Sequence, residues 1–230
     1  MGAAMYKHLI FDLDDTLLDF KAGEKLGLDM VLTGHGISDL ASALERYHVI
    51  NHDLWRQVEQ GADRTKLLDG RFAKLFAEFG QAVDGHTLEM EYRHYLDTNY
   101  AKVPEADTTL RALVDQNYTI LAGTNGVKAT QEARLSHSGL EIYFDAVYTS
   151  EEIGHSKPAA EFFQHIFDHE RGMQSSKTVM IGDGLTADIQ GAQNFGLDRI
   201  WVNLRNEANQ TEFIPTHEVH QLRDLQAILA

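Results

Sequence analysis

The chain has 230 residues, no cysteine and a formal net charge of −15 at pH 7. The absence of cysteine excludes disulfides and thiolate metal sites. The acidic balance argues against nucleic acid polymers as partners, because no basic stripe exists to displace counterions from a phosphate backbone. No apolar run reaches the length of a membrane span and no signal-peptide pattern is present, so we expect a cytoplasmic protein without a membrane partner.

The first part of the chain predicts one strand followed by a long helical insertion. Residues 8–11, His-Leu-Ile-Phe, are apolar enough for a buried strand and lead directly into an acidic cluster. From about Phe20 to Tyr100, strand patterns give way to apolar residues at helical spacing. One helix of this block is expected to begin at Asn51 or Asp53 and to end at Gly61.

Beyond Pro104, predicted helices and strands alternate. The expected strands cover residues 118–123, 144–149, 178–181 and 199–202. The expected helices cover residues 108–116, 127–138, a segment with Pro158 in its first turn, 186–195 and 222–229. This alternation predicts a Rossmann-like α/β fold, a doubly wound and mostly parallel sheet with helices on both faces. We therefore expect a core domain of residues 5–18 and 102–230, with a helical domain at 19–101.

Short polar clusters follow the ends of several predicted strands. They are residues 11–16, 124–126, 156–158 and 181–188. Ligands of such sheets bind beyond the carboxyl ends of the strands, which is where these clusters fall. Together they supply an acidic pair, a hydroxyl group, a lysine and a second acidic pair. These groups suit Mg²⁺-assisted phosphoryl transfer through an aspartate nucleophile.

The same residues carry a resemblance to a known family. Asp12-x-Asp14-x-Thr16, Thr124, Lys157 and the segment Gly182–Asp188 resemble the four motifs of the haloacid dehalogenase superfamily of hydrolases. The resemblance covers the expected core domain. It implies that the helical insertion is a four-helix-bundle cap, whose polar loop in this superfamily reaches down over the active site.

The resemblance also implies roles for the acidic residues. Asp12 is expected to be the nucleophile, and Asp14 to protonate the leaving oxygen and then activate a water molecule. Asp12, Asp183 and the backbone carbonyl of Asp14 are expected to ligate Mg²⁺. Asp188 is expected to hold Lys157 or a water molecule of the metal site, although it also suits a helix N-terminus.

The phosphate group is expected to contact Thr124, Asn125 and Lys157. Thr124 would donate its hydroxyl hydrogen, with the Asn125 amide beside it, and Lys157 would supply a fixed positive charge. Taken alone, Thr-Asn-Gly is equally typical of a simple turn, and a single lysine is more often solvated.

The expected activity is Mg²⁺-dependent hydrolysis of a small phosphorylated metabolite. Residues 54–76 resemble the bacterial pyrimidine 5′-nucleotidase branch of the superfamily, which implies a nucleoside monophosphate as substrate. Alternatives are a phosphoglycolate or sugar phosphatase, a phosphomutase, and a non-catalytic binding protein on the same fold. Dehalogenase chemistry is disfavoured, because those relatives lack the second aspartate that is present here as Asp14.

Substrate selection is expected to reside in the insertion. The candidates for contact with the leaving group are Arg64 and Lys66 in a polar connection between helices, Arg71, and Phe20 for stacking on a base. Each of the three cations is also compatible with an ordinary solvated surface charge. The sequence predicts no oligomeric state.

Overall fold

The computed structural model describes residues 6–229, so residue 5, where the expected core domain begins, lies outside the described part. Contacts between residues divide the chain into two compact units, Met1–Asp19 with Tyr100–Ala230 and Phe20–Asn99. The first unit thus breaks off at 19 and resumes at 100, where the sequence suggested 18 and 102. We call the two parts the core unit and the helical unit. Within the described residues, no helix combines the length and apolarity needed to cross a membrane.

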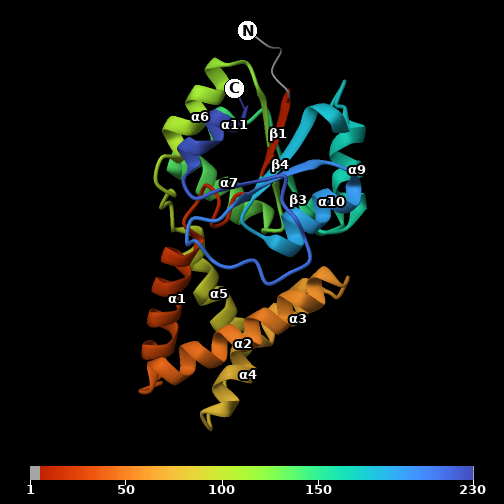
Figure 1. Cartoon of the computed structure of the whole chain (residues 1–230). Coiled ribbons are helices and arrows are strands. Elements are labelled where there is room, and N and C mark those ends of the chain that lie inside the picture. Colours follow the sequence, from red (N-terminus) through yellow and green to blue (C-terminus); the bar gives the residue numbers. More distant parts are fainter. Residues whose placement is uncertain (1–5, 230) are drawn as a thin grey trace. The chain divides into compact units, whose positions relative to one another are not determined.

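The core unit is built on a sheet of six strands in the order β3-β2-β1-β4-β5-β6, and every pairing is parallel (Figure 1). The strands are β1 (His8–Phe11), β2 (Thr119–Thr124), β3 (Ala146–Thr149), β4 (Thr178–Gly182), β5 (Asp198–Val202) and β6 (His217–Val219). This topology confirms the predicted doubly wound fold. Strand β6 was not predicted, because it is three residues long and buries only Val219.

Helices cover both faces of this sheet (Figure 1). They are α6 (Ala106–Asp115), α7 (Lys128–Ser138), α8 (Ser150–Ile153), α9 (Ala160–His169), the π-helix η3 (Leu185–Gln190), α10 (Gly191–Phe195) and α11 (Leu225–Leu229). Leu9 and Phe11 of β1 pack with α6, α7 and α11, whereas Ile10 packs with α9 and α10. Successive strand residues point to opposite faces, so both faces of the central strands must be apolar.

Two predicted helix starts are wrong. Pro158 was expected in the first turn of a helix, but α9 begins at Ala160. The Asn125 side chain bonds the backbone of Lys157 at both N and O, which holds the chain before Pro158 outside the helix. The helix expected to begin near Asn51 or Asp53 starts earlier, because Asp39 caps it by accepting a hydrogen bond from the Ser42 backbone N–H.

The helical unit contains α1 (Phe20–Gly34), α2 (Leu40–Glu59), α3 (Arg64–Asp69), α4 (Arg71–Glu78) and α5 (Gly85–Asp97). It has its own apolar core, formed by side chains such as Leu28, Tyr47, Phe72 and Tyr92. Five helices occupy residues 20–99 where a four-helix bundle was expected, because Gly70 separates the six-residue α3 from α4.

Candidate active site

The parallel sheet brings the polar clusters of the core unit to one edge. Asp12 directly follows β1, Asp183 directly follows the neighbouring β4, and Thr124 is the last residue of β2 on the other side of β1. The backbone N–H of Asp12 donates to the carbonyl of Ile181 at 2.8 Å, which continues the sheet pairing up to the acidic residues. Strand pairing therefore fixes the main chain on which the site is built.

The turn after Asp12 contains an aspartate with an uncommon backbone conformation. The φ of Asp15 is 55°, in the left-handed region. Glycine occupies this region without strain, and aspartate tolerates it better than most residues. The position therefore reflects backbone conformation, and we assign Asp15 no chemistry.

Lys157 lies at the centre of the site. Its Nζ contacts Asp12 Oδ1 at 2.9 Å and Asp188 Oδ1 at 2.6 Å, and its side chain is 1% exposed. Burial alone would lower the pKa of Lys157, but the charges of the two carboxylates outweigh burial and raise the pKa above its ordinary value. The lysine therefore stays protonated and bridges the two acids.

Asp188 can approach Lys157 because the neighbouring residue, Gly182, has no side chain. A Cβ atom on Gly182 would lie 2.2 Å from Asp188 Oδ2, so only glycine fits there. The same oxygen accepts a hydrogen bond from the Gly184 N–H at 2.9 Å. Both oxygens of Asp188 are thus engaged within the protein, which agrees with a role in holding Lys157.

Asp183 is oriented by Thr16 and Trp201, for which no role was predicted. The Asp183 N–H donates to Thr16 Oγ1 at 3.0 Å, and that hydroxyl donates to Asp183 Oδ1 at 3.3 Å. Trp201 Nε1 donates to the Asp183 carbonyl at 2.9 Å. These bonds fix the main chain and the carboxylate of Asp183 together.

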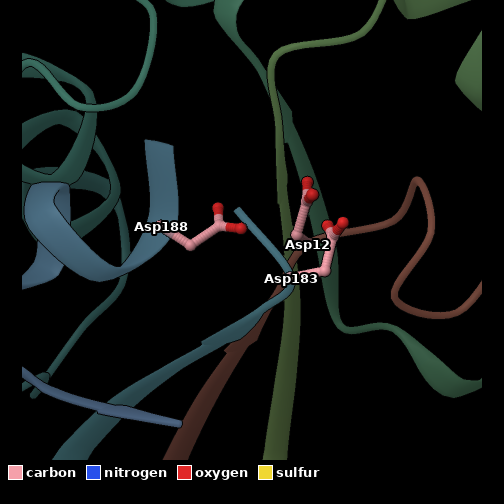
Figure 2. Close-up of side chains that lie close together, drawn as sticks. All are labelled: Asp12, Asp183 and Asp188. Carbon is pink, nitrogen blue, oxygen red and sulfur yellow. The ribbon is translucent and has the colours of Figure 1, made fainter. Parts of the chain in front are cut away.

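Three carboxylates converge at the edge of the sheet. One oxygen from each of Asp12, Asp183 and Asp188 lies within 4.8 Å of the others (Figure 2). Burial raises the pKa of Asp12 to about 7, and the charges of Asp188 and Asp14 add to this rise, while Lys157 opposes it. Burial together with Asp12 and Asp188 raises the pKa of Asp183 well above its ordinary value. A group of buried carboxylates with one lysine among them is a site that favours a hard cation.

Two neighbouring donors orient the hydroxyl group of Thr124. Its Oγ1 accepts from the Gly126 N–H at 3.0 Å and from Gln131 Nε2 at 3.3 Å. A hydroxyl oxygen has two lone pairs, so both are used and its hydrogen is left to donate elsewhere. This arrangement suits a donor to a phosphate oxygen.

Asp14 contacts residues that the sequence analysis missed. Gln131 Nε2 donates to Asp14 Oδ2 at 2.6 Å, and Arg134 Nη1 forms an ion pair with Asp14 Oδ1. Both partners lie on α7 and each is 1% exposed. Their three-residue spacing places them on one face of a helix, but nothing in the sequence indicates that this face meets the Asp14 turn.

The predicted residues of the core unit therefore come together. Those brought together are Asp12, Asp14, Thr124, Lys157, Asp183 and Asp188. The Asn125 side chain, expected beside the phosphate, donates to the Lys157 carbonyl at 2.9 Å and accepts from the Lys157 N–H at 2.8 Å. Its side chain therefore positions Lys157, and contact of Asn125 with the phosphate stays a prediction.

Arg71 was expected as a substrate contact, and its surroundings in the helical unit contradict this. Its Nε and Nη2 donate to the two oxygens of Glu89 at 2.7 and 2.9 Å, and Nη1 donates to Asn51 Oδ1 at 2.9 Å. The guanidinium also lies 4.5 Å from the centre of the Tyr92 ring. With Arg71 only 4% exposed, this group stabilises the interior of the helical unit.

The other candidates in the helical unit are placed as follows. Arg64 and Lys66 were expected in a loop, but both lie in α3, whose N-cap is Asp63. Lys66 is exposed and Arg64 is half-buried. Phe20 begins α1 and is partly buried against the core of the helical unit. These three remain predictions for substrate contact.

The raised pKa values of Asp12 and Asp183 predict how the stability of the metal-free protein depends on pH. Aspartate in an unfolded chain titrates near 3.9, so the folded state binds protons more tightly. The contribution of these two groups to stability is full below about pH 4, and the part from Asp12 is lost as the pH rises through about 7. In EDTA, we expect the melting temperature to fall between about pH 5 and about pH 8, and Mg²⁺ to restore more stability at the higher pH.

The control for this prediction is Asp183→Asn, measured by thermal unfolding at both pH values. Removing one carboxylate should flatten the pH dependence and abolish the stabilisation by Mg²⁺. A wild-type melting temperature that rises with pH in EDTA, or an unchanged Mg²⁺ effect in the variant, would contradict the assignment.

Comparisons with known proteins identify the family. The model of the haloacid dehalogenase-like hydrolase family matches residues 6–196. Pyrimidine 5′-nucleotidase PynA of Streptococcus pneumoniae is 41% identical over 96% of this chain and 93% of its own length. Pyrimidine 5′-nucleotidase YjjG of Escherichia coli is 29% identical over 96% of both chains.

A solved structure also matches both units. The putative hydrolase YfnB of Bacillus subtilis, crystallised with magnesium, superposes with a TM-score of 0.92 at 36% identity and covers 97% of this chain and 98% of its own. A dehalogenase superposes with a TM-score of 0.80 at 20% identity, which shows a shared fold. Since the family match spans most of the chain and includes every acidic residue of the site, the chain belongs to the haloacid dehalogenase-like hydrolases and is a phosphatase of that family.

Proposed function

We propose that this enzyme hydrolyses a nucleoside 5′-monophosphate through a phosphorylated Asp12. The observation that supports this most strongly is the placement of Asp12. Its carboxylate is 14% exposed, follows the central strand β1 and is held at 2.9 Å by the buried Lys157. A carboxylate fixed in this way is a suitable nucleophile, because it needs no base to activate it.

In the first step, an Asp12 oxygen attacks phosphorus and forms a new P–O bond. The bond between phosphorus and the nucleoside oxygen breaks, and Asp14 gives its proton to that oxygen, so a neutral alcohol leaves. Lys157 and the Thr124 hydroxyl stabilise the charge on the phosphoryl oxygens. Asp188 keeps Lys157 in place at 2.6 Å throughout.

In the second step, a water molecule attacks phosphorus and loses a proton to Asp14. The bond between phosphorus and Asp12 breaks, which releases inorganic phosphate and restores the Asp12 carboxylate. Asp14 ends the cycle protonated, as it began. The one residue therefore serves as acid and then as base, which requires its carboxyl group to stay in reach of both oxygens.

The converging carboxylates also fit a divalent cation. Asp12 and Asp183 would hold it together with the backbone carbonyl of Asp14, the ligand that the family resemblance implies, and an all-oxygen donor set suits Mg²⁺. When bound, Mg²⁺ would neutralise negative charge on the phosphate and on Asp12, so that the two anions can approach. The raised pKa values of Asp12 and Asp183 support this, because burial and the neighbouring carboxylates disfavour their charged forms, and a bound cation would offset that.

The choice of substrate is supported by relatives. Two of them, at 41% and 29% identity, are named pyrimidine 5′-nucleotidases. A sugar phosphatase is the second candidate, supported by a ribulose-1,5-bisphosphate 5-phosphatase of Halopiger xanaduensis at 30% identity. Within the helical unit, we propose Phe20, Arg64 and Lys66 as residues that select the leaving group.

The experiment is a phosphate-release assay on a panel of esters, with Mg²⁺ and with EDTA. The panel contains pyrimidine and purine nucleoside 5′-monophosphates, phosphoglycolate, a sugar phosphate and p-nitrophenyl phosphate. We expect the pyrimidine nucleotides to give the highest kcat/KM, and EDTA to abolish all activity. Preference for another ester would reject the nucleotide assignment alone, whereas full turnover in EDTA would reject the metal-assisted mechanism. Phe20→Ala, Arg64→Ala and Lys66→Ala are compared on the same panel.

A further inference from the structure

Two buried residues of α7, Gln131 and Arg134, hold both oxygens of the Asp14 carboxylate. Gln131 Nε2 donates to Oδ2 at 2.6 Å, and Arg134 Nη1 contacts Oδ1. With one donor on each oxygen, rotation of the carboxylate is restricted. Asp14, which must exchange a proton twice in each cycle, is therefore held by two residues that do not belong to the four family motifs.

The two residues are also connected to each other and to the phosphate-binding hydroxyl. Gln131 Oε1 accepts from Arg134 Nη1 at 3.4 Å, and Gln131 Nε2 lies 3.3 Å from Thr124 Oγ1. The charged donor orients the amide, because its acceptor oxygen must face Arg134 and its NH₂ must face Asp14 and Thr124. Gln131 thus couples the position of Asp14 to that of Thr124.

The backbone of the neighbouring motif is shaped to admit Gln131. A Cβ atom on Gly126 would lie 2.1 Å from Gln131 Nε2 and 2.7 Å from its Cγ. Any other residue at position 126 would displace the amide. This close approach gives Gly126 a function that its place in a turn does not require.

The burial of Arg134 supports a role beyond stability. A buried arginine loses its hydration, and a buried ion pair is often no more stable than apolar side chains of similar volume. Here the arginine is 1% exposed, whereas the Asp14 side chain it contacts is 29% exposed. The buried guanidinium of Arg134 therefore contacts a carboxylate that is still partly open to solvent. This arrangement is expected when the orientation of the Asp14 carboxylate matters for proton transfer.

We propose that Gln131 and Arg134 are positioning residues that hold Asp14 for proton transfer to and from the substrate oxygens. This inference rests on the proposed function, in which Asp14 protonates the leaving oxygen. An ester whose leaving group departs as a stable anion needs little help from Asp14. An alkyl ester needs that proton, so its first step alone should slow when Asp14 is mispositioned, whereas the second step, which uses Asp14 as a base, is the same for both esters.

The test compares 4-nitrobenzyl phosphate with 4-nitrophenyl phosphate, which differ by one methylene between the ring and the leaving oxygen. In Arg134→Met and Gln131→Leu, we expect kcat/KM for the benzyl ester, which reports the step that forms the phosphorylated enzyme, to fall on the order of 10- to 100-fold more than kcat/KM for the phenyl ester. Arg134→Lys, which keeps a charged donor, should recover part of the lost ratio. Gly126→Ala should reproduce the Gln131 effect while both α7 side chains remain.

Controls separate positioning from stability and from the proposed function itself. Glu132→Ala, on the exposed side of the same helix, should leave both esters unaffected. In Asp14→Asn, adding Arg134→Met should not change the ester ratio further. Equal losses of kcat/KM on both esters in folded variants would overturn the inference. If the wild type hydrolyses neither ester, the proposed function fails before the inference is reached.

Discussion

Replacing Asp12 with asparagine should lower kcat at least about a thousandfold while leaving the fold intact. The amide is nearly the same size as the carboxylate, but it cannot form the bond to phosphorus that the first step requires. The substitution also removes one of the converging carboxylates and so reduces the charge repulsion among them. We therefore expect the variant to be at least as stable as wild type. The measurement is kcat for p-nitrophenyl phosphate with saturating Mg²⁺.

Asp14→Asn is the matched control, since it changes a carboxylate on the same turn that does not attack phosphorus. Rapid-quench experiments should trap a phosphorylated protein in wild type and none in Asp12→Asn. In Asp14→Asn, 4-nitrophenyl phosphate should still phosphorylate the protein, and the phosphoryl group should persist because its hydrolysis lacks a base. Activity of Asp12→Asn within about tenfold of wild type would mean that another residue is the nucleophile.

The sequence predicted those parts of the structure that follow from short-range patterns. Strands β1 and β4 are continuous apolar runs because they are buried on both faces, so they are recognisable without tertiary information. Asp12 and Asp183 follow these runs directly. Once the sheet is parallel, the ends of neighbouring strands must meet, and the two acids with them.

The sequence could not predict the contacts that depend on which surfaces meet in the folded protein. In the sequence, Arg71 looks like a solvated cation, but Glu89, eighteen positions further on in α5, reaches it inside the helical unit. Gln131 and Arg134 likewise look like ordinary polar residues of α7 until the helix is placed against the Asp14 turn. Helical periodicity predicts one face of one helix and carries no information about its neighbour.

Asn125 illustrates a second limit. An asparagine next to Thr124 is typical both of a phosphate donor and of a turn, so the residue type alone does not distinguish the two roles. The contact that the sequence does not indicate is with the Lys157 backbone, thirty-two positions away. Only the packing of the segment before α9 against the end of β2 reveals it.

Replacing Lys157 with methionine should destabilise the protein as well as inactivate it. The lysine is 1% exposed and separates Asp12 from Asp188, whose side chain is fully buried. Breaking a buried ion pair by removing one partner typically costs about 3–5 kcal/mol, because the remaining charge is left without compensation. The loss of a fixed positive charge beside the phosphate should lower kcat by about 10²–10³-fold. Chemical denaturation and steady-state kinetics measure the two effects.

The double variant Lys157→Met with Asp188→Asn tells the two effects apart. Removing the Asp188 charge relieves the repulsion that the single variant creates, and asparagine can still accept the Gly184 N–H through its side-chain oxygen. Most of the lost stability should therefore return. Activity should not return, because no cation has been restored next to Asp12. If the double variant recovered activity along with stability, Lys157 would act only by neutralising Asp188, and its assignment to the phosphate would be wrong.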